Sequence, residues 1–339
     1  MATSSLAYVD GQPKVCGVIR KRPEDFQVDE VLGFDLTGEG EHVCLHIRKR
    51  NSNTAFVAKQ IARLAGVRNM DVSCAGLKDR HAVTTQWFSV YLSNNPEPDW
   101  SQLNNDDVAV LTVKRHNRKL RRGALKGNRF RIVVRELSGE VAPLDERLKR
   151  IAEQGVPNYF GEQRFGHDGD NLKKARAMFS GEFKVRNRDK RSLYLSAARS
   201  EIFNQVLGKR VEAGQWNQPL DGDVMMLDGS HSVFTVDAVD EEIKRRVSEY
   251  DIHPTGPLWG RGALSSQADV QTMEQGVAEH YELFCNGLER AGMKQERRPL
   301  RLSVAELAWQ RLDDSLNIEF FLGSGSYATT VLREVVGVR

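Results

Sequence analysis

The chain has 339 residues, of which 40% are apolar and 28% charged, and its 49 basic and 46 acidic side chains give a net charge of +3. This composition excludes wholesale disorder, and the length predicts two domains of roughly 150 residues each. Because no stretch approaches the roughly 18 to 20 uncharged apolar residues of a membrane-spanning helix, we expect a cytoplasmic protein with no membrane partner.

The first part of the chain predicts a sheet with two helices. Alternating apolar, β-branched and aromatic residues predict strands within 20–30 and at 42–47, 71–75, 84–92, 108–114 and 129–137. Apolar residues at helical spacing predict helices at 53–67 and 145–154. In the first helix Val57, Ile61 and Leu64 share one face, Asn53 is the expected N-cap and Gly66 the stop.

The second part changes character after Gly155, where we place a domain boundary. It predicts a helix at 192–207, a small β region at 221–239 and a helix at 274–291. The segment RRPLR at 297–301 breaks the pattern and marks a second boundary. Ser303 and Glu306 form a capping box that predicts a helix at 303–312, followed by a strand at 316–322 and a turn through Gly323 and Gly325.

Basic residues are concentrated in one segment. From Lys114 to Arg131 there are nine Lys or Arg in eighteen positions and no acidic residue. Such a run favours contact with phosphates, and we expect Arg118, Lys119, Arg121 and Arg122 to contact an RNA backbone. A solvated basic loop is the alternative. A second cluster between Lys173 and Arg191 is diluted by acidic residues and is weaker evidence.

The four cysteines are far apart in the sequence. No CxxC pair and no Cys/His spacing typical of zinc is present, which predicts reduced thiols and no metal site. They are Cys16, Cys44, Cys74 and Cys285.

A candidate for catalysis lies in the segment CAGLKDRHAVTTQ at 74–86. Asp79 stands between Lys78 and Arg80, in a loop that joins two predicted strands. An ionised carboxylate held there can act as a nucleophile or a general base. From composition alone, a turn aspartate in a salt bridge is the simpler interpretation.

The residues Gly76-Leu77-Lys78-Asp79, followed by Ala82, Thr84 and Gln86, closely resemble the GxKDxxAxTxQ signature of the TruD family of pseudouridine synthases. Further segments resemble the family in the same order along nearly the whole chain: PEDFQVDE at 23–30, KRNSNT at 49–54, KGNRF at 126–130, VPNYFGEQRFG at 156–166 and GSYATTVLRE at 325–334. Arg20 and Arg80 stand where lysine is common in the family. The segment LGSGSYAT at 322–329 lacks the proline that is common in the family before a glycine of this segment.

This resemblance implies an α+β fold with a pseudouridine-synthase catalytic core, an antiparallel sheet with RRM-like halves and flanking helices. An inserted α/β TRUD-specific domain interrupts the core. With the boundaries above, the catalytic domain is expected at 1–154 and 301–339 and the inserted domain at 155–300.

The resemblance also implies isomerisation of a tRNA uridine, expected at position 13, to pseudouridine, with Asp79 as the catalytic carboxylate. The reaction transfers no electrons and no external group, so no cofactor is expected. The partner is tRNA, and we expect a monomer without an obligate protein partner. The carboxylate can add to ribose C1′, add to the base, or remove the C2′ proton, and the sequence leaves these routes open.

The family likeness places further residues in the base pocket. Phe26, Phe130 and Phe320 are expected to stack on the uracil and Asn128 to hydrogen-bond to it. Without the family, Phe26 and Phe130 are core aromatics of strands. Phe320 competes with Phe321, since neighbouring strand residues face opposite ways.

Lys78 is expected either to stabilise the Asp79 carboxylate or to contact phosphate.

Two other classes of function compete with the synthase. A non-catalytic RNA-binding protein would share the basic and aromatic features but not need Asp79. A carboxylate hydrolase would need a second acid, and Asp313-Asp314 is better interpreted as a helix end.

Overall fold

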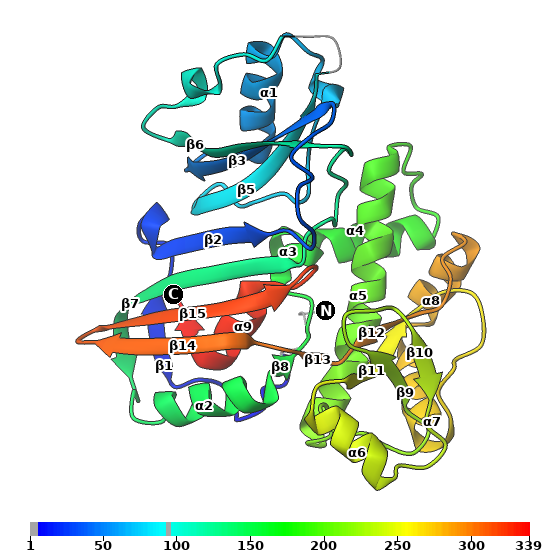
Figure 1. Ribbon diagram of the computed structural model, residues 1–339. Coiled ribbons are helices and arrows are strands. Elements are labelled where there is room, and N and C mark those ends of the chain that lie inside the picture. The colour runs from blue at the N-terminus through cyan, green and yellow to red at the C-terminus, as the bar shows by residue number, and fades with distance from the viewer. Residues whose placement is uncertain (1–5, 93–95) are drawn as a thin grey trace. The chain divides into compact units, whose positions relative to one another are not determined.

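The computed structural model describes residues 6–92 and 96–339, which form an α+β fold (Figure 1). The chain divides into two units, each assembled from separate segments. We call Lys14–Glu146, Val304–Ala328 and Val336–Arg339 the sheet unit, and Met1–Pro13, Arg147–Ser303 and Thr329–Val335 the helix-rich unit.

The sheet unit is built on one large sheet. Its main strands follow the order β14-β15-β7-β2-β5-β3-β6, while β1 pairs with β7 and β16, and β4 pairs with β5. Most neighbours are antiparallel, but β2 and β5 are parallel where the two halves meet. The elements are β1 Val15–Val18, β2 Phe26–Val31, β3 His42–Arg50, α1 Thr54–Leu64, β4 Val72–Cys74, β5 Val83–Tyr91, β6 Val108–His116, β7 Gly127–Gly139, β14 Ala305–Leu312, β15 Ser315–Gly323 and β16 Gly337–Val338.

Helix α1 covers the half of the sheet formed by β3, β5 and β6. Val57 and Ile61 are fully buried against Leu45, Ile47 and Phe88, as the spacing of the apolar residues predicts. Burying each such side chain contributes about 1.5–3 kcal/mol, so this face fixes α1 on the sheet. The strands and the helix predicted up to residue 137 are confirmed.

One row of residues crosses the sheet through five strands. Lys49 on β3 lies opposite Thr84 on β5, and Thr84 lies opposite Val28 on β2. Val28 in turn lies opposite Phe130 on β7, and Phe130 opposite Phe320 on β15. Directly opposed residues project from the same face, so the sheet order unites residues from distant parts of the sequence.

The helix-rich unit is organised around the long helix α5, which has apolar clusters along its length. A four-stranded sheet has the order β10-β9-β11-β12, and β13 pairs with β8. The elements are α2 Leu144–Gln154, which begins in the sheet unit, β8 Val156–Pro157, α3 Glu162–Phe165, α4 Asp170–Phe179, α5 Arg188–Glu212, β9 Val224–Leu227, β10 Val233–Thr235, α6 Glu241–Ser248, β11 Ile252–Leu258, α7 Ala268–His280, α8 Glu282–Arg290, β12 Glu296–Pro299, β13 Arg301–Leu302 and α9 Ala328–Val335.

The helix predicted at 303–312 is wrong, because Ala305–Leu312 is strand β14. It pairs with β15 through a turn of Asp313 and Asp314, so these two acids do not end a helix. Asp313 has φ of 44°, a conformation that aspartate tolerates better than most residues. Glu306 pairs with Arg129 of β7 instead of capping a helix. The hydrogen bonds between β14 and β15 therefore determine the structure of this segment, and the capping box at Ser303 does not.

The helix predicted at 274–291 is two helices, α7 and α8, separated at Tyr281. The Tyr281 hydroxyl donates to Glu201 on α5 at 3.0 Å, and its ring packs in the apolar cluster. Apolar spacing continues across this break, which explains why the sequence pattern does not reveal it. The predicted helices at 145–154 and 192–207 and the β region at 221–239 are confirmed.

Candidate active site

Asp79 lies in the loop between β4 and β5, residues 75–82, which we call the Asp79 loop. Its side chain is 52% exposed, and its Oδ2 accepts a hydrogen bond from the Arg20 guanidinium at 2.6 Å. Arg20 has φ of 58° and lies over the Phe26 ring, 4.1 Å from the ring centroid. The guanidinium therefore links the candidate carboxylate to the first aromatic residue of the predicted pocket.

The main chain of the Asp79 loop is held by a buried lysine. Lys49 of β3 is fully buried, and its ammonium donates to the Asp79 carbonyl at 3.0 Å and to the Ser52 carbonyl at 2.6 Å. Burial lowers the pKa of Lys49 to about 8; the nearby Asp79 carboxylate opposes this shift and the Lys78 ammonium adds to it.

Two further buried side chains fix the beginning of the loop. The Thr54 hydroxyl accepts from the Lys78 amide at 3.1 Å and donates to the Gln86 side-chain oxygen at 2.9 Å. The Gln86 amide nitrogen then donates to the Gly76 carbonyl at 3.0 Å. Thr54, Gln86 and Lys49 thus bond to main-chain groups at three points between Gly76 and Asp79.

Lys78 forms a buried ion pair with Glu30 at 2.6 Å, with side-chain exposures of 6% and 0%. The other Glu30 oxygen accepts from the Trp87 amide at 3.0 Å. This geometry favours an internal role for Lys78 over direct contact with phosphate. A Cβ at Gly76 would lie 3.1 Å from the Lys78 ammonium, so a side chain there would press on this ion pair.

The predicted aromatic residues form one cluster. Phe130 stacks on Phe320 with ring centroids 5.3 Å apart, and Phe26 meets Phe130 edge-on at 6.3 Å. All three rings are at least 94% buried. Phe320, and not Phe321, shares the face of Phe130; Phe321 lies opposite Arg129 on the other face.

Polar atoms without partners surround this cluster. Among the described residues, the Asn128 side-chain oxygen, the Thr84 hydroxyl and the Arg20 Nε are buried and make no hydrogen bond. Asn128 lies opposite Glu30, and Thr84 opposite Val28, on the face that carries the aromatic rings. An unsatisfied buried acceptor or donor is costly, so each of these atoms has capacity for a further hydrogen bond.

The basic run divides into two groups. Arg115, Arg129 and Arg131 lie on strands and pair with Glu97, Glu306 and Asp29. Residues 117–126, which we call the basic loop, connect β6 to β7 and expose all four predicted RNA contacts. Within the described chain Arg118, Arg121 and Arg122 form no ion pair, while Lys119 donates to the Met70 carbonyl at 2.9 Å.

The basic loop is joined to the Asp79 loop. The Gly123 amide donates to the Ala75 carbonyl at 2.8 Å. The loop that carries the predicted RNA contacts is therefore attached to the loop that carries the candidate carboxylate, in the same unit. The second basic cluster lies in the helix-rich unit, on α4, on α5 and between them; its residues are exposed, and Lys174 pairs with Asp170.

No group of metal-ligating side chains occurs among residues 6–92 and 96–339, and the four cysteines are free. In the same residues no helix has the length and apolarity needed to cross a membrane.

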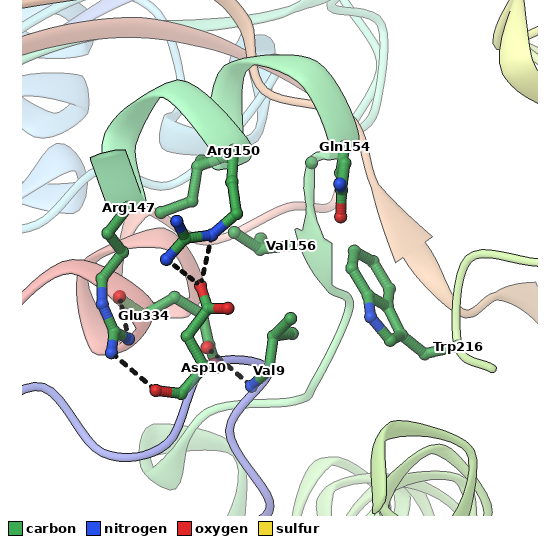
Figure 2. A pocket seen from close by; sticks show the side chains of 10 residues that line it. Val9, Asp10, Arg147, Arg150, Gln154, Val156, Trp216 and Glu334 are labelled. Carbon is green, nitrogen blue, oxygen red and sulfur yellow. Dashed lines mark hydrogen bonds and ion pairs between the residues drawn. The ribbon is translucent and has the colours of Figure 1, made fainter. Parts of the chain in front are cut away.

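A cavity of about 10 Å³ in the helix-rich unit holds one water at most. Figure 2 shows the Arg150 side chain directed at Asp10, which it binds at 2.9 Å, while Arg147 donates to the Glu334 carbonyl. These polar groups already bond to one another, and the cavity is too small for a uridine.

Sequence reasoning did not assign site roles to Lys49, Thr54, Gln86, Glu30 or Arg20. The segments that resemble the family contain the first four, so a signal was present. Their roles depend on which main-chain atoms they reach, and only the folded sheet determines that.

Comparisons with known proteins show the family of this chain. The family model of TruD, tRNA pseudouridine synthase D, matches residues 3–185 and 169–335. The proteins named tRNA pseudouridine synthase D from Nitrosococcus oceani and Methylococcus capsulatus are 52% and 53% identical to the chain. Each comparison covers 98% of this chain, and 93% and 94% of the respective relative.

A solved structure shares the fold. The crystal structure of the putative tRNA pseudouridine synthase D from Methanosarcina mazei matches with a TM-score of 0.74 and 22% identity. The match covers 99% of this chain and 95% of that one. The fold, the family match and the two relatives agree along nearly the entire sequence, and the chain belongs to the TruD family of tRNA pseudouridine synthases.

Proposed function

We propose that this protein isomerises a uridine of tRNA to pseudouridine and that Asp79 is its catalytic carboxylate. Relatives at about 50% identity carry the name tRNA pseudouridine synthase D. The observation that supports the role of Asp79 most directly is its geometry: a half-exposed carboxylate, bonded to Arg20, on a loop held by buried side chains. A reactive group needs this combination of access and fixed position.

The reaction breaks the bond between ribose C1′ and N1 of uracil, rotates the freed base and joins C1′ to C5. Asp79 adds to C1′, adds to the base or removes the C2′ proton. Each route needs the carboxylate in its ionised form. The Arg20 guanidinium lies 2.6 Å from that carboxylate and holds its orientation.

A uridine in folded RNA must be extruded before this chemistry. Phe26, Phe130 and Phe320 provide the apolar side of its pocket. The unpartnered Asn128 oxygen is an acceptor for the uracil N3–H, and such a bond distinguishes uracil from cytosine, whose N3 has no proton. Lys78 contributes indirectly, through its pair with Glu30 beneath the loop.

The basic loop supplies the electrostatic attraction for tRNA, through Arg118, Lys119, Arg121 and Arg122.

Position 13 of the tRNA is the proposed target. The proposed catalytic domain is 1–154 with 301–339, and the proposed insertion is 155–300, a segment that lies within the helix-rich unit. We further propose a monomer that works in the cytoplasm.

The test is pseudouridine mapping in tRNA transcripts incubated with the purified protein. Wild type should modify one uridine, and Asp79→Asn should abolish turnover while tRNA affinity and thermal stability stay close to wild type. Asp106→Asn is the matched control, since Asp106 is also an exposed aspartate of the sheet unit. Turnover by Asp79→Asn would refute the catalytic role, and tight tRNA binding without any modification by wild type would favour a non-catalytic RNA-binding protein.

A further inference from the structure

A fully buried lysine such as Lys49 is an unusual residue to hold a loop in place. Its side chain is fully buried, and burying an ammonium is costly unless an opposite charge or several hydrogen bonds compensate it. Among the described residues, its ammonium donates to two main-chain carbonyls, those of Ser52 and Asp79, and to no carboxylate oxygen. A neutral donor could satisfy both carbonyls at lower cost, so the charge itself requires an explanation.

The charged groups around Lys49 come from the Asp79 loop. They are the Asp79 carboxylate, which is bonded to Arg20, and the Lys78 ammonium, which is bonded to Glu30. The residues opposite Lys49 on the neighbouring strands, Thr84 on β5 and Val108 on β6, are uncharged. Asp79 and Lys78 act on Lys49 in opposite directions, and its burial dominates both.

Lys49 therefore approaches Asp79 from the protein interior, and Arg20 meets the carboxylate at the surface. A positive charge at the carbonyl of Asp79 fixes the main chain of that residue and also adds to the positive potential at its carboxylate. Loss of the charge leaves a neutral amine with two N–H donors, which holds the two carbonyls more weakly and no longer adds positive potential at the residue proposed to react. A misplacement of about 1 Å at a reacting group costs on the order of 100-fold in rate.

We propose that Lys49 is a positioning residue for the isomerisation, and that its buried ammonium holds the Asp79 backbone in the reactive position. The inference rests on the proposed role of Asp79. It places Lys49 in the chemical step and outside tRNA binding, because no part of its side chain is accessible to RNA.

The experiment compares wild type, Lys49→Gln and Lys49→Arg with a matched control, Ile47→Val, on the same strand and face. Single-turnover rate at saturating tRNA, tRNA Kd and thermal melting are measured for each. Lys49→Gln should lower the rate at least ten-fold and leave Kd within two-fold of wild type. Ile47→Val should lower the melting temperature slightly and leave rate and Kd unchanged.

A pH profile separates positioning from simple structural support. The wild-type rate should fall above about pH 8, where Lys49 loses its proton. Lys49→Arg keeps its charge across this range, so it should retain part of the wild-type rate and lose the alkaline fall. This profile remains decisive even if Lys49→Gln does not fold.

Wild-type rate in Lys49→Gln, or the same alkaline fall in Lys49→Arg as in wild type, would overturn the inference. If the proposed function itself is wrong, the experiment gives a result that differs from both of these. In that case wild type makes no pseudouridine, or Asp79→Asn remains active, whatever the behaviour of the Lys49 variants.

Discussion

The Asp79 loop and the basic loop adjoin each other but are held in different ways. The Asp79 loop is bonded from the interior by the buried side chains of Lys49, Thr54 and Gln86. The basic loop is attached through backbone amides, such as that of Leu120 to the Ser89 hydroxyl, while its arginines extend into solvent. In the proposed function, the first loop fixes the catalytic carboxylate and the second presents positive charge to tRNA.

This difference predicts two kinds of variant. Changes beneath the Asp79 loop should alter the rate of the chemical step, because they move the reacting group. Changes in the basic loop should alter affinity and its salt dependence, because exposed cations act by long-range attraction and counterion release. The aromatic cluster next to Asp79 belongs to the first kind.

The largest effect on folding stability is expected for Phe130→Ala. Phe130 is 94% buried between Phe26 and Phe320, so the truncation should cost about 3–5 kcal/mol of folding stability. If its ring also borders the extruded uracil, the single-turnover rate per folded molecule should fall roughly ten-fold, in line with about 1–3 kcal/mol for a base stack.

Ile132→Ala is the matched control for Phe130→Ala. Ile132 lies two residues along β7, on the same face and 99% buried; it is opposite Phe26 but is not itself one of the three rings. It should lower stability without lowering the rate. A wild-type rate in folded Phe130→Ala would remove Phe130 from the active site.

The next effect concerns the free energy of unfolding and its dependence on pH. Burial lowers the pKa of Lys49 to about 8, whereas an unfolded lysine titrates near 10.4. Between these values the unfolded chain binds more protons, so stability rises with pH. The folded protein bears the cost of the charge below about pH 8 and is relieved of up to about 3 kcal/mol by pH 10.

Urea unfolding of wild type and Lys49→Met at pH 7 and pH 10 measures this change. The difference between the two proteins should move in favour of wild type at the higher pH. An identical pH dependence in both would show that the Lys49 amine is not buried as described. Since activity should fall over the same range, stability and rate are expected to change in opposite directions.

The smallest effect per residue is expected in the basic loop. Replacing Arg118, Arg121 and Arg122 with Gln should reduce the slope of log affinity against log salt by about two to three units, at roughly 0.7–0.9 per phosphate contact. The control replaces Arg115, Arg129 and Arg131, which carry the same charge but are paired with carboxylates. An equal change in both triple variants would mean that only net charge matters.

The elements of the sheet unit follow well from the sequence, because their apolar residues alternate or recur at helical spacing. The capping box at Ser303 misleads, since β14 is determined by its ladder with β15. The sequence pattern also gives no sign of the helix break at Tyr281, because apolar residues continue at helical spacing on both sides of it.

The candidate site is predictable only in part. Asp79, Phe26 and Phe130 are identified by the segments that resemble the TruD family. The roles of Lys49 and Thr54 are not, because each acts on a main-chain atom that sequence does not specify. The choice between Phe320 and Phe321 depends on the register of β15 against β7, which the structure supplies.

The most direct test of the division between the two loops is a paired measurement of single-turnover rate at saturating tRNA and of tRNA Kd. The two proteins compared are Asp79→Asn and the triple variant of Arg118, Arg121 and Arg122. Asp79→Asn should lose the rate and keep the wild-type Kd, and the triple variant should lose affinity and keep the wild-type rate at saturation. A triple variant that is slow at saturation, or an Asp79→Asn protein that still forms pseudouridine, would contradict the assignment of chemistry to one loop and binding to the other.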